Sequence, residues 1–470
     1  MPNQELCFTP AVDLAARIRD REISPVEVVA NALDRIEEVN DRLNCFCFVY
    51  PEEALARAKE AERAVLRGEA LGRLHGVPIA FKDMTPTRGK RTTLGSRLYE
   101  DWIPDHDAVV VERLVRAGAI IVGKTTTSEL AFSYFTETEL WGATRNPWDL
   151  SRPPGGSSGG SGAAVAAGCV PLAEGSDMGG SVRLPAAFCG VVGLKPSFGR
   201  IPFDLFPSQF DTFCHFGPLA RSVGDAALFL RLAQGPDDRD ILSLPVAPEI
   251  PDPLPDDVRG LRLAFSVDLG YYAVDREVAD NALRAIDALR AEGAQIDPVE
   301  LPWTKEINEA GWRHWNAYMA ALLSDRFESE RGRLSGPIVE AVEAGRSMAA
   351  VALKEVEFIR TQQWAALRPI LEKYAALLCP TAPVAPPPLG TRESDYGTLD
   401  AEGRYRQCEM TFAFNMISPC PALSVPSGFT SQGLPTGLQI VGRRYDDAMV
   451  LRIGAALERA LGWRETRPPI

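Results

Sequence analysis

Histidine is scarce in this sequence, with 4 in 470 residues, and the 9 cysteines are scattered without one CxxC pair. Zinc sites and disulfide frameworks need histidines and cysteines clustered at short spacings. The sequence therefore indicates neither a metal site nor a disulfide framework, and it calls for no cofactor.

Basic charge is also in short supply. The 50 Lys and Arg residues are outnumbered by 63 Asp and Glu residues, giving a formal net charge of −13. No basic excess exists to neutralise phosphates, which disfavours a nucleic-acid partner. No apolar run approaches the ~20 residues that span a bilayer, and the start, MPNQELCFTP, lacks the regions of a signal peptide. We therefore expect a protein of the reducing cytoplasm with no membrane contact.

Glycine and serine, by contrast, are concentrated in two stretches, PGGSSGGSGA (Pro154 to Ala163) and EGSDMGGSVRLPAA (Glu174 to Ala187). A flexible linker would be flanked by polar residues, whereas these stretches run on into AAVAAG and VRLPAAFCG. The backbone is therefore expected to be buried and closely approached, which glycine permits. Serines on such an amide-rich floor suit nucleophilic catalysis with an oxyanion site.

Lys82 is a second candidate for chemistry, at the end of an apolar run in HGVPIAFKDM (His75 to Met84). Most lysines are solvated or paired with acids. Here the run VPIAF predicts a buried strand that carries Lys82 toward the interior, where desolvation favours the neutral amine. A neutral lysine near pH 7 can act as a general base.

The stretch from Thr125 to Trp148 is rich in aromatic and small polar residues. One interpretation is a core helix followed by a loop, and for any single aromatic residue we favour the core. The functional interpretation is a pocket wall in which Phe132, Tyr134 and Phe135 form an apolar lining.

Alternating helix and strand patterns predict an α/β protein. Residues 9–70 have the pattern of amphipathic helices, with Ser24-Pro25-Val26-Glu27 as a capping box. Further on, Asp107 is expected to cap the helix VVVERLVRAG, which is followed by the strand AIIV.

We therefore expect one large domain over residues 1–470, with a mixed, mostly parallel central β-sheet covered by helices on both faces. Residues 70–235 form the expected catalytic core segment. Residues 303–378 have an almost wholly helical pattern, and we expect them to be an insertion that covers one side.

The segment GAIIVGKT (Gly118 to Thr125) matches the phosphate-loop pattern GxxxxGK[ST]. The amides of a real phosphate loop are free to bind phosphate. Ala, Ile, Ile and Val instead predict a strand whose amides are used in a sheet. A nucleotide-binding protein is thus an alternative from another class, which an ATP-binding assay would test.

Several of these segments together resemble the amidase signature hydrolases. In family order they are GVPIAFKD, GATRNPW, PGGSSGGSGAAVAAG, GSDMGGSVRLPAAFCGVVGLKPS, GPLARSVGDAAL, CPTAP and GLPTGLQIVG. The resemblance extends over most of the chain, from about residue 9 to 460, and is weakest over 240–370.

The resemblance implies that Lys82 is the catalytic lysine, Ser157 the bridging serine and Ser181 the nucleophile. It also implies a cis peptide bond between Gly156 and Ser157. The oxyanion hole that it implies consists of the backbone amides of Met178, Gly179, Gly180 and Ser181.

The chemistry expected from the residues agrees with this resemblance. Neutral Lys82 accepts a proton from Ser157, which takes one from Ser181, and Ser181 Oγ attacks the carbonyl carbon of a small amide. The substrate-binding residues that we expect are Ala131, Phe132, Tyr134, Phe135 and Met178. This apolar lining predicts that the substrates are neutral aryl or apolar amides. The sequence leaves open whether esters and carbamates are also cleaved.

Two departures from the family pattern concern the pocket and not the catalytic groups. Met178 stands where the family often has threonine, and Pro419 and Cys420 stand where it commonly has a glycine-containing turn. The first affects the rim of the oxyanion hole, and the second reshapes one edge of the pocket.

Other interpretations remain open at this point. The glutaminase component of a glutamyl-tRNA amidotransferase, its A subunit, usually carries a tyrosine-rich helical stretch, which residues 335–370 lack. A catalytically dead interaction module would lack Lys82, Ser157 or Ser181, and all three are present. Dimers are common in the family, so a homodimer is the assembly implied, although the sequence itself does not reveal the oligomeric state.

Overall fold

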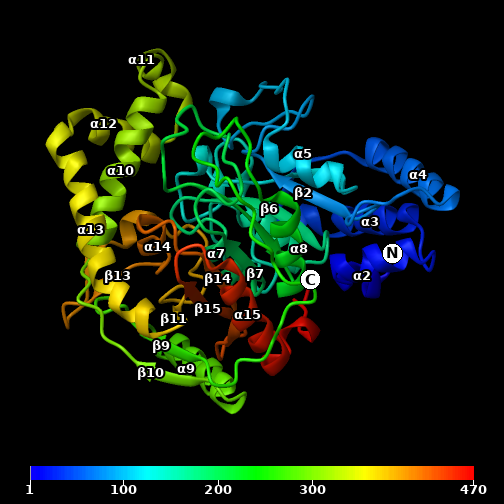
Figure 1. Cartoon of the computed structure of the whole chain (residues 1–470). Helices are drawn as coiled ribbons and strands as arrows, with labels where there is room; N and C mark the ends of the chain where they lie inside the picture. Colours follow the sequence, from blue (N-terminus) through cyan, green and yellow to red (C-terminus); the bar gives the residue numbers. More distant parts are fainter. Residues whose placement is uncertain (1) are drawn as a thin grey trace.

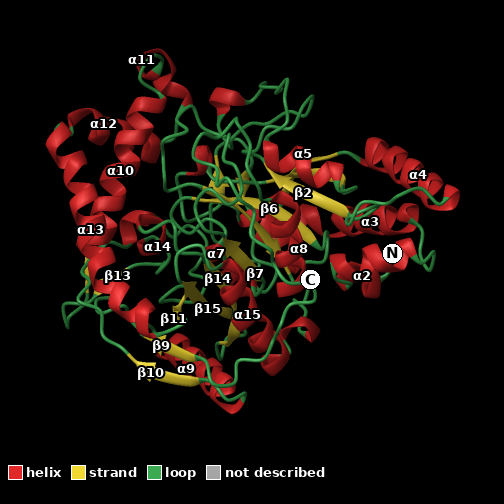
Figure 2. Cartoon of the chain, viewed as in Figure 1, coloured by secondary structure: helices red, strands yellow, loops and turns green. Residues whose placement is uncertain are grey.

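The computed structural model describes residues 2–470, and an eleven-stranded sheet runs through their centre (Figures 1 and 2). From edge to edge its strands are β1 (Phe46–Val49), β3 (Ile120–Thr125), β2 (Pro78–Lys82), β6 (Leu172–Asp177), β8 (His215–Ala220), β7 (Val192–Lys195), β14 (Ala422–Phe429), β15 (Pro435–Gly442), β11 (Ala376–Pro380), β9 (Arg262–Phe265) and β10 (Gln295–Pro298). Two small hairpins lie outside it, β4 (Glu137–Thr138) with β5 (Gly142–Ala143) and β12 (Thr398–Leu399) with β13 (Tyr405–Arg406).

The sheet is mixed, as predicted, but parallel pairs are not the majority. Four neighbouring pairs are parallel and six are antiparallel. Parallel pairs occur toward the two ends of the sheet, where helices link successive strands. The middle is antiparallel, because β14 and β15 form a hairpin and β7 and β8 are joined without a crossover helix.

Fifteen α-helices surround the sheet within residues 2–470. They are α1 (Gln4–Phe8), α2 (Ala11–Arg19), α3 (Pro25–Leu43), α4 (Pro51–Arg67), α5 (Val109–Arg116), α6 (Gly159–Ala166), α7 (Arg183–Cys189), α8 (Val223–Ala233), α9 (Arg276–Ala291), α10 (Glu306–Leu322), α11 (Phe327–Glu330), α12 (Gly336–Ser347), α13 (Ala350–Lys373), α14 (Ala413–Met416) and α15 (Asp447–Leu461). Short 3₁₀ turns cover Arg97–Tyr99, Glu129–Ala131, Arg331–Arg333, Glu393–Asp395 and Trp463–Glu465.

Helices cover both faces of the sheet, as the sequence predicted. Successive residues of a strand point to opposite faces. Accordingly, Ile79 and Phe81 of β2 join the core that α8, α9 and α15 complete. Ala80, between them, joins the core formed with α3, α6 and α7.

The helices α10 to α13 lie along one side of the molecule, at the left of Figure 1. Their positions confirm that residues 303–378 are mostly helical. They share a separate core with α14, to which Trp315 and Met319 of α10 contribute. That this region is an insertion stays a prediction.

At the N-terminal end, the capping box at Ser24 is confirmed. The helical pattern over 9–70 is interrupted, however, by the edge strand β1. The predicted cap at Asp107 is wrong: Ala108 precedes α5, and the carboxylate of Asp204 accepts from the Val109 amide at 3.0 Å. A cap supplied from a remote loop leaves no local sequence signal.

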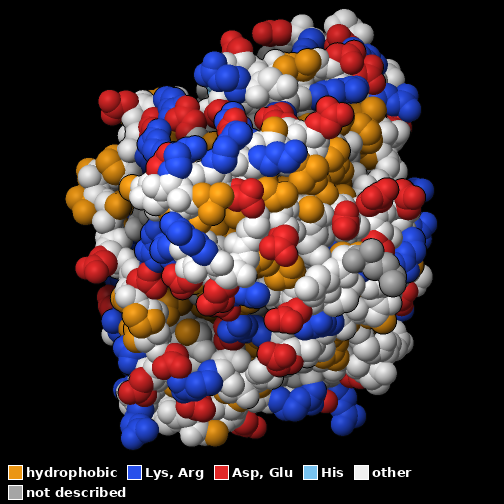
Figure 3. Space-filling model, turned by 90° about the vertical axis from the view of Figure 1, so that its right-hand side faces the viewer, with side chains coloured by type: hydrophobic (Ala, Val, Ile, Leu, Met, Phe, Trp, Pro, Cys, Tyr) orange, Lys and Arg blue, Asp and Glu red, His pale blue; other side chains and the backbone are white. Residues whose placement is uncertain are grey.

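On the face shown in Figure 3, acidic and basic side chains are intermingled, with hydrophobic patches between them. Among residues 2–470, no helix has both the length and the apolar character needed to cross a membrane.

A buried ion pair ties the segment after β7 to the last helix and generates a stability prediction. Asp447 accepts from Arg200 Nη2 at 2.7 Å and from the Ser197 amide at 2.8 Å, and its side chain is 0% exposed. Asp447→Ala leaves the guanidinium buried and unpaired, so it should lower the free energy of unfolding by about 3–5 kcal/mol.

Denaturant titration measures this loss. The matched control is Glu112→Ala, which breaks the surface pair with Arg239 and should cost at most about 1 kcal/mol. Equal losses of unfolding free energy in the two variants would contradict the conclusion that the buried pair of Asp447 with Arg200 stabilises the fold.

Candidate functional site

Lys82 is the last residue of β2 and its side chain is fully buried. Its Nζ lies 2.6 Å from Ser157 Oγ and 3.0 Å from Ser176 Oγ. Burial lowers the pKa of Lys82 to about 7, against the opposing effect of the nearby Glu174 and Asp177 carboxylates. The geometry thus pairs an amine that can be neutral near pH 7 with a serine hydroxyl.

Ser157 lies just before α6, after a cis peptide bond from Gly156, as the resemblance implied. Gly156 packs against residues 133–135 so closely that a Cβ would lie 2.7 Å from Ser133 O. The next amide, that of Ser158, donates to the Ser181 carbonyl at 3.1 Å. The two glycine-serine stretches are therefore joined at Ser181 and at Ser158, the residue after Ser157.

Ser181 lies between β6 and α7 and is 5% exposed. Within residues 2–470 its hydroxyl has no hydrogen-bond partner, and neither do the backbone amides of Met178, Gly179 and Ser181. The three free amides can donate hydrogen bonds to a carbonyl oxygen while the free hydroxyl attacks the carbonyl carbon.

Gly180 differs from what the resemblance implied. Its amide donates to Asp177 Oδ1 at 2.9 Å, so it is already occupied. Its φ of +117° is a conformation that favours glycine, and a Cβ there would lie 1.8 Å from Thr411 Oγ1. In our interpretation Gly180 shapes the loop, and the other three amides are available as donors.

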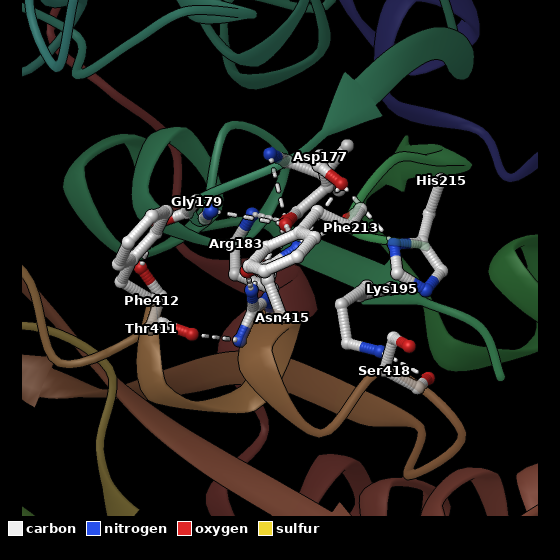
Figure 4. Close-up of polar contacts among 12 residues, drawn as sticks. Asp177, Gly179, Arg183, Lys195, Phe213, His215, Thr411, Phe412, Asn415 and Ser418 are labelled. Atoms are coloured by element: carbon white, nitrogen blue, oxygen red, sulfur yellow. Dashed lines mark hydrogen bonds and ion pairs between the residues drawn. The ribbon is translucent and has the colours of Figure 1, made fainter. Parts of the chain in front are cut away.

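Asp177 holds in place the loop of residues 178–182, which joins β6 to α7 (Figure 4). Its carboxylate accepts from Arg183 Nη2 and from Asn415 Nδ2, each at 2.9 Å, and also from the Val182 amide. Burial by itself would raise the pKa of Asp177, but Arg183 and Asn415 outweigh it and hold that pKa below its usual range. A charged, fully bonded carboxylate therefore fixes both ends of the loop.

His215 and Lys195 lie beside this network in Figure 4. The carbonyl of Asp177 lies 3.2 Å from His215 Nδ1. Burial lowers the pKa of His215 well below its usual value, so the ring is neutral, and Nδ1 donates to that carbonyl. Lys195 Nζ donates to the carbonyls of Pro196, Ser418 and Cys420, which gives it a structural place away from Ser157.

Aromatic rings pack against the loop of residues 178–182 at Gly179. Phe412 and Trp315 pack on Gly179, where a Cβ would lie 2.6 Å from Phe412 Cδ2 and 3.1 Å from Trp315 Cζ3. Phe132 stands edge-on to Trp315 at 5.5 Å between ring centroids. Met178 belongs to the same apolar cluster.

The expected pocket residues do not all lie together. Phe132 and Tyr134 both contact Trp312, at 5.6 Å and 5.7 Å between ring centroids. Phe135 instead faces Tyr396 at 6.4 Å. Ala131 is buried with a φ of +58°, an uncommon conformation for a residue with a Cβ.

A groove of about 570 Å³ borders this aromatic cluster and is lined by Phe132, Trp312 and Tyr405. Three carboxylates also line it, those of Glu309, Glu340 and Glu393. The cation in the same lining, Arg313, lies 3.6 Å from Glu355.

The phosphate-loop alternative is wrong. Ile120–Thr125 is the strand β3, bonded to β1 and β2 on its two sides. Lys124 is fully buried and donates to the carbonyl of Thr85. Neither the amides nor the lysine can reach a phosphate.

Three aromatic residues of the site, Trp312, Trp315 and Phe412, were not predicted as such, nor were Asp177 and its partners Arg183 and Asn415. Trp312 and Trp315 were visible near the start of the helical region, but nothing local linked them to the serines. Phe412 had no signal at all, since its neighbour Thr411 meets Gly179 across 232 positions of chain. Over residues 2–470 no three His, Cys, Asp or Glu side chains form a group that could hold a metal ion.

Comparison with known proteins identifies the family of this chain. The amidase family model matches residues 27–451. An acylamidase from Rhodococcus erythropolis is 37% identical over 476 residues, covering 100% of this chain and 98% of the relative. The glutamyl-tRNA(Gln) amidotransferase of Chloroflexus aggregans has an A subunit that is 36% identical over 473 residues, covering 96% of each.

Solved structures point the same way. A bacterial aryl acylamidase of the amidase signature family superimposes with a TM-score of 0.90 at 30% identity, covering 97% of this chain and 98% of that one. A 6-aminohexanoate cyclic dimer hydrolase gives a TM-score of 0.86 at 30% identity, with 98% and 99% covered. The chain belongs to the amidase signature family, and it is a hydrolase that acts on the C–N bond of amides.

The pKa of Lys82 generates a prediction for the pH dependence. If neutral Lys82 is the base, kcat/KM for an uncharged amide should rise with pH through about 7 and level off above, because only the unprotonated amine accepts a proton. Steady-state kinetics from pH 5 to about 9.5, with chemistry limiting, measures this limb. A rate that is flat over that range would exclude Lys82 as the base.

Proposed function

We propose that this chain is an amidase that hydrolyses small neutral amides with an aryl or apolar part, through an acyl-Ser181 intermediate. The observation that carries the proposal is the contact of 2.6 Å between buried Lys82 Nζ and Ser157 Oγ, beside a serine whose hydroxyl and neighbouring amides are free.

The proton moves from Ser181 to Lys82 during the attack on the carbonyl carbon. Ser181 Oγ gives its proton to Ser157 Oγ as it attacks the carbonyl carbon, and Ser157 gives its own to neutral Lys82. Lys82 becomes an ammonium. The same path in reverse protonates the leaving amine, and water then releases the acid from Ser181.

The negative charge that forms on the carbonyl oxygen is received by the amides of Met178, Gly179 and Ser181. Losing one such donor typically costs about 3–4 kcal/mol of transition-state stabilisation. The Asp177 carboxylate, held by Arg183, keeps the loop in the conformation that presents these amides.

The surroundings favour apolar substrates. The rings of Phe132, Trp312, Trp315 and Phe412 form a continuous aromatic path from the groove to Gly179. The groove adds the carboxylates of Glu340 and Glu393, which repel an anionic substrate. Its third carboxylate, that of Glu309, is paired with Lys305, and its arginine is close to Glu355. A substrate carboxylate would therefore lose its hydration without gaining a cationic partner.

The amidotransferase component remains the second candidate, because relatives of that class are 36% identical. The superposition is poorer, with a TM-score of 0.78 for the protein of that class from Thermotoga maritima, against 0.90 for the aryl acylamidase. Together with the aromatic path, this difference supports the stand-alone amidase.

The nucleophile assignment is tested by Ser181→Ala. The hydroxyl that forms the acyl-enzyme is lost while the loop keeps its backbone bonds, so kcat should fall by about 10⁴-fold or more with little change in melting temperature. Steady-state kinetics and thermal denaturation of the purified variant measure both. Substantial turnover by a folded Ser181→Ala protein would refute the assignment.

The substrate preference is tested by comparing a neutral anilide with glutamine. Burial of about 100 Å² of aryl surface contributes roughly 2.5 kcal/mol, which is on the order of 50-fold in kcat/KM. Phe132→Ala should lower the value for the anilide but leave that for acetamide nearly unchanged. Comparable kcat/KM for anilide and glutamine in the wild type would refute the aryl preference alone.

A further inference from the structure

Glu174 is a fully buried acid in β6, the strand next to β2. Its Oε2 accepts from the backbone amide of Lys82 at 3.0 Å. Both carboxylate oxygens also accept from Thr85 Oγ1 at 3.0 Å. The carboxylate is thus bonded to the segment that carries the proposed base, at Lys82 itself and three residues beyond it.

We propose that Glu174 is a positioning residue for the amidase reaction, which fixes the backbone of Lys82 and supplies negative charge that stabilises the ammonium formed when Lys82 accepts a proton. This inference rests on the function proposed above and assigns to it a further residue. Glu174 takes no proton from the substrate in this account and forms no bond to it.

The electrostatic surroundings support such a role. Burial lowers the pKa of Lys82, and Glu174 acts against that effect by favouring the ammonium. Burial also raises the pKa of Glu174, but the bonds from the Lys82 amide and Thr85, together with the charges of Lys82 and Lys124, favour its charged form. Lys124 Nζ is held nearby by the carbonyls of Lys82 and Thr85. The other charged and titratable groups that act on these side chains are Asp83, Asp107, Asp177, Cys47 and Cys214.

The sign of the effect follows from the charges. An anion close to an amine favours the protonated amine. When Glu174 is made neutral, the Lys82 ammonium loses that stabilisation, and Lys82 stays unprotonated down to a lower pH. The acid limb of kcat/KM should then shift to lower pH, whereas a merely structural defect would lower the plateau and leave the midpoint in place.

The test is the pH profile of Glu174→Gln with a neutral anilide as substrate. The midpoint of the acid limb should move down by about one pH unit, since a nearby opposite charge typically shifts a pKa by 1–3 units. Glu174→Leu, a second neutral variant without polar side-chain atoms, should shift it in the same direction. Glu174→Asp keeps the charge and should stay closer to the wild type.

The matched control is Glu458→Gln in α15. Glu458 is also a carboxylate whose pKa burial raises to about 7, and it also accepts from a backbone amide, that of Val223. The described groups whose charge shifts the pKa of Lys82 are Glu174, Asp177 and Cys214, and Glu458 is not among them. Its neutral variant should therefore leave the midpoint where it is.

A midpoint that stays at the wild-type value in whichever of Glu174→Gln and Glu174→Leu is folded, as judged by circular dichroism, would overturn the inference. So would an equal shift in Glu458→Gln. Failure of the proposed function looks different: the wild type would then lack the acid limb, or Ser181→Ala would keep its activity.

Discussion

The rest of this site depends on the contact between Lys82 and Ser157, both of which are fully buried. An ammonium in water holds its proton until far above neutral pH, and desolvation at the end of β2 removes that preference. The close packing of Gly156 on residues 133–135 holds the chain where Ser157 meets the amine. The large sheet supplies the interior in which Lys82 is fully buried.

A second buried charged group, the carboxylate of Asp177, holds the loop that carries Ser181 and the oxyanion amides. Asp177 is charged because Arg183 and Asn415 compensate for its burial, and it uses that charge to hold the Gly180 and Val182 amides. The amides left free are those of Met178, Gly179 and Ser181. The loop is therefore pre-organised for an oxyanion, and Phe412 and Trp315 close it from the opposite side.

The sequence predicted those features that depend on residues close together in the chain. The run before Lys82 predicted a buried strand, the capping box predicted the start of α3, and dense glycine predicted close backbone approach. It failed where distant segments decide the outcome. Asp204 caps α5 in place of Asp107, the hairpin at β14 and β15 makes the middle of the sheet antiparallel, and Phe412 reaches Gly179 across more than two hundred residues. Glu174 is visible in the sequence, but only the pairing of β6 with β2 places it beside Lys82.

A crystal structure of the protein inactivated by a fluorophosphonate would test the central claim most directly. The account predicts a covalent bond from phosphorus to Ser181 Oγ, with the phosphoryl oxygen about 2.7–3.1 Å from two or more of the Met178, Gly179 and Ser181 amides, and the Gly180 amide still bonded to Asp177. A label on another residue, or a phosphoryl oxygen that points away from these amides, would contradict it.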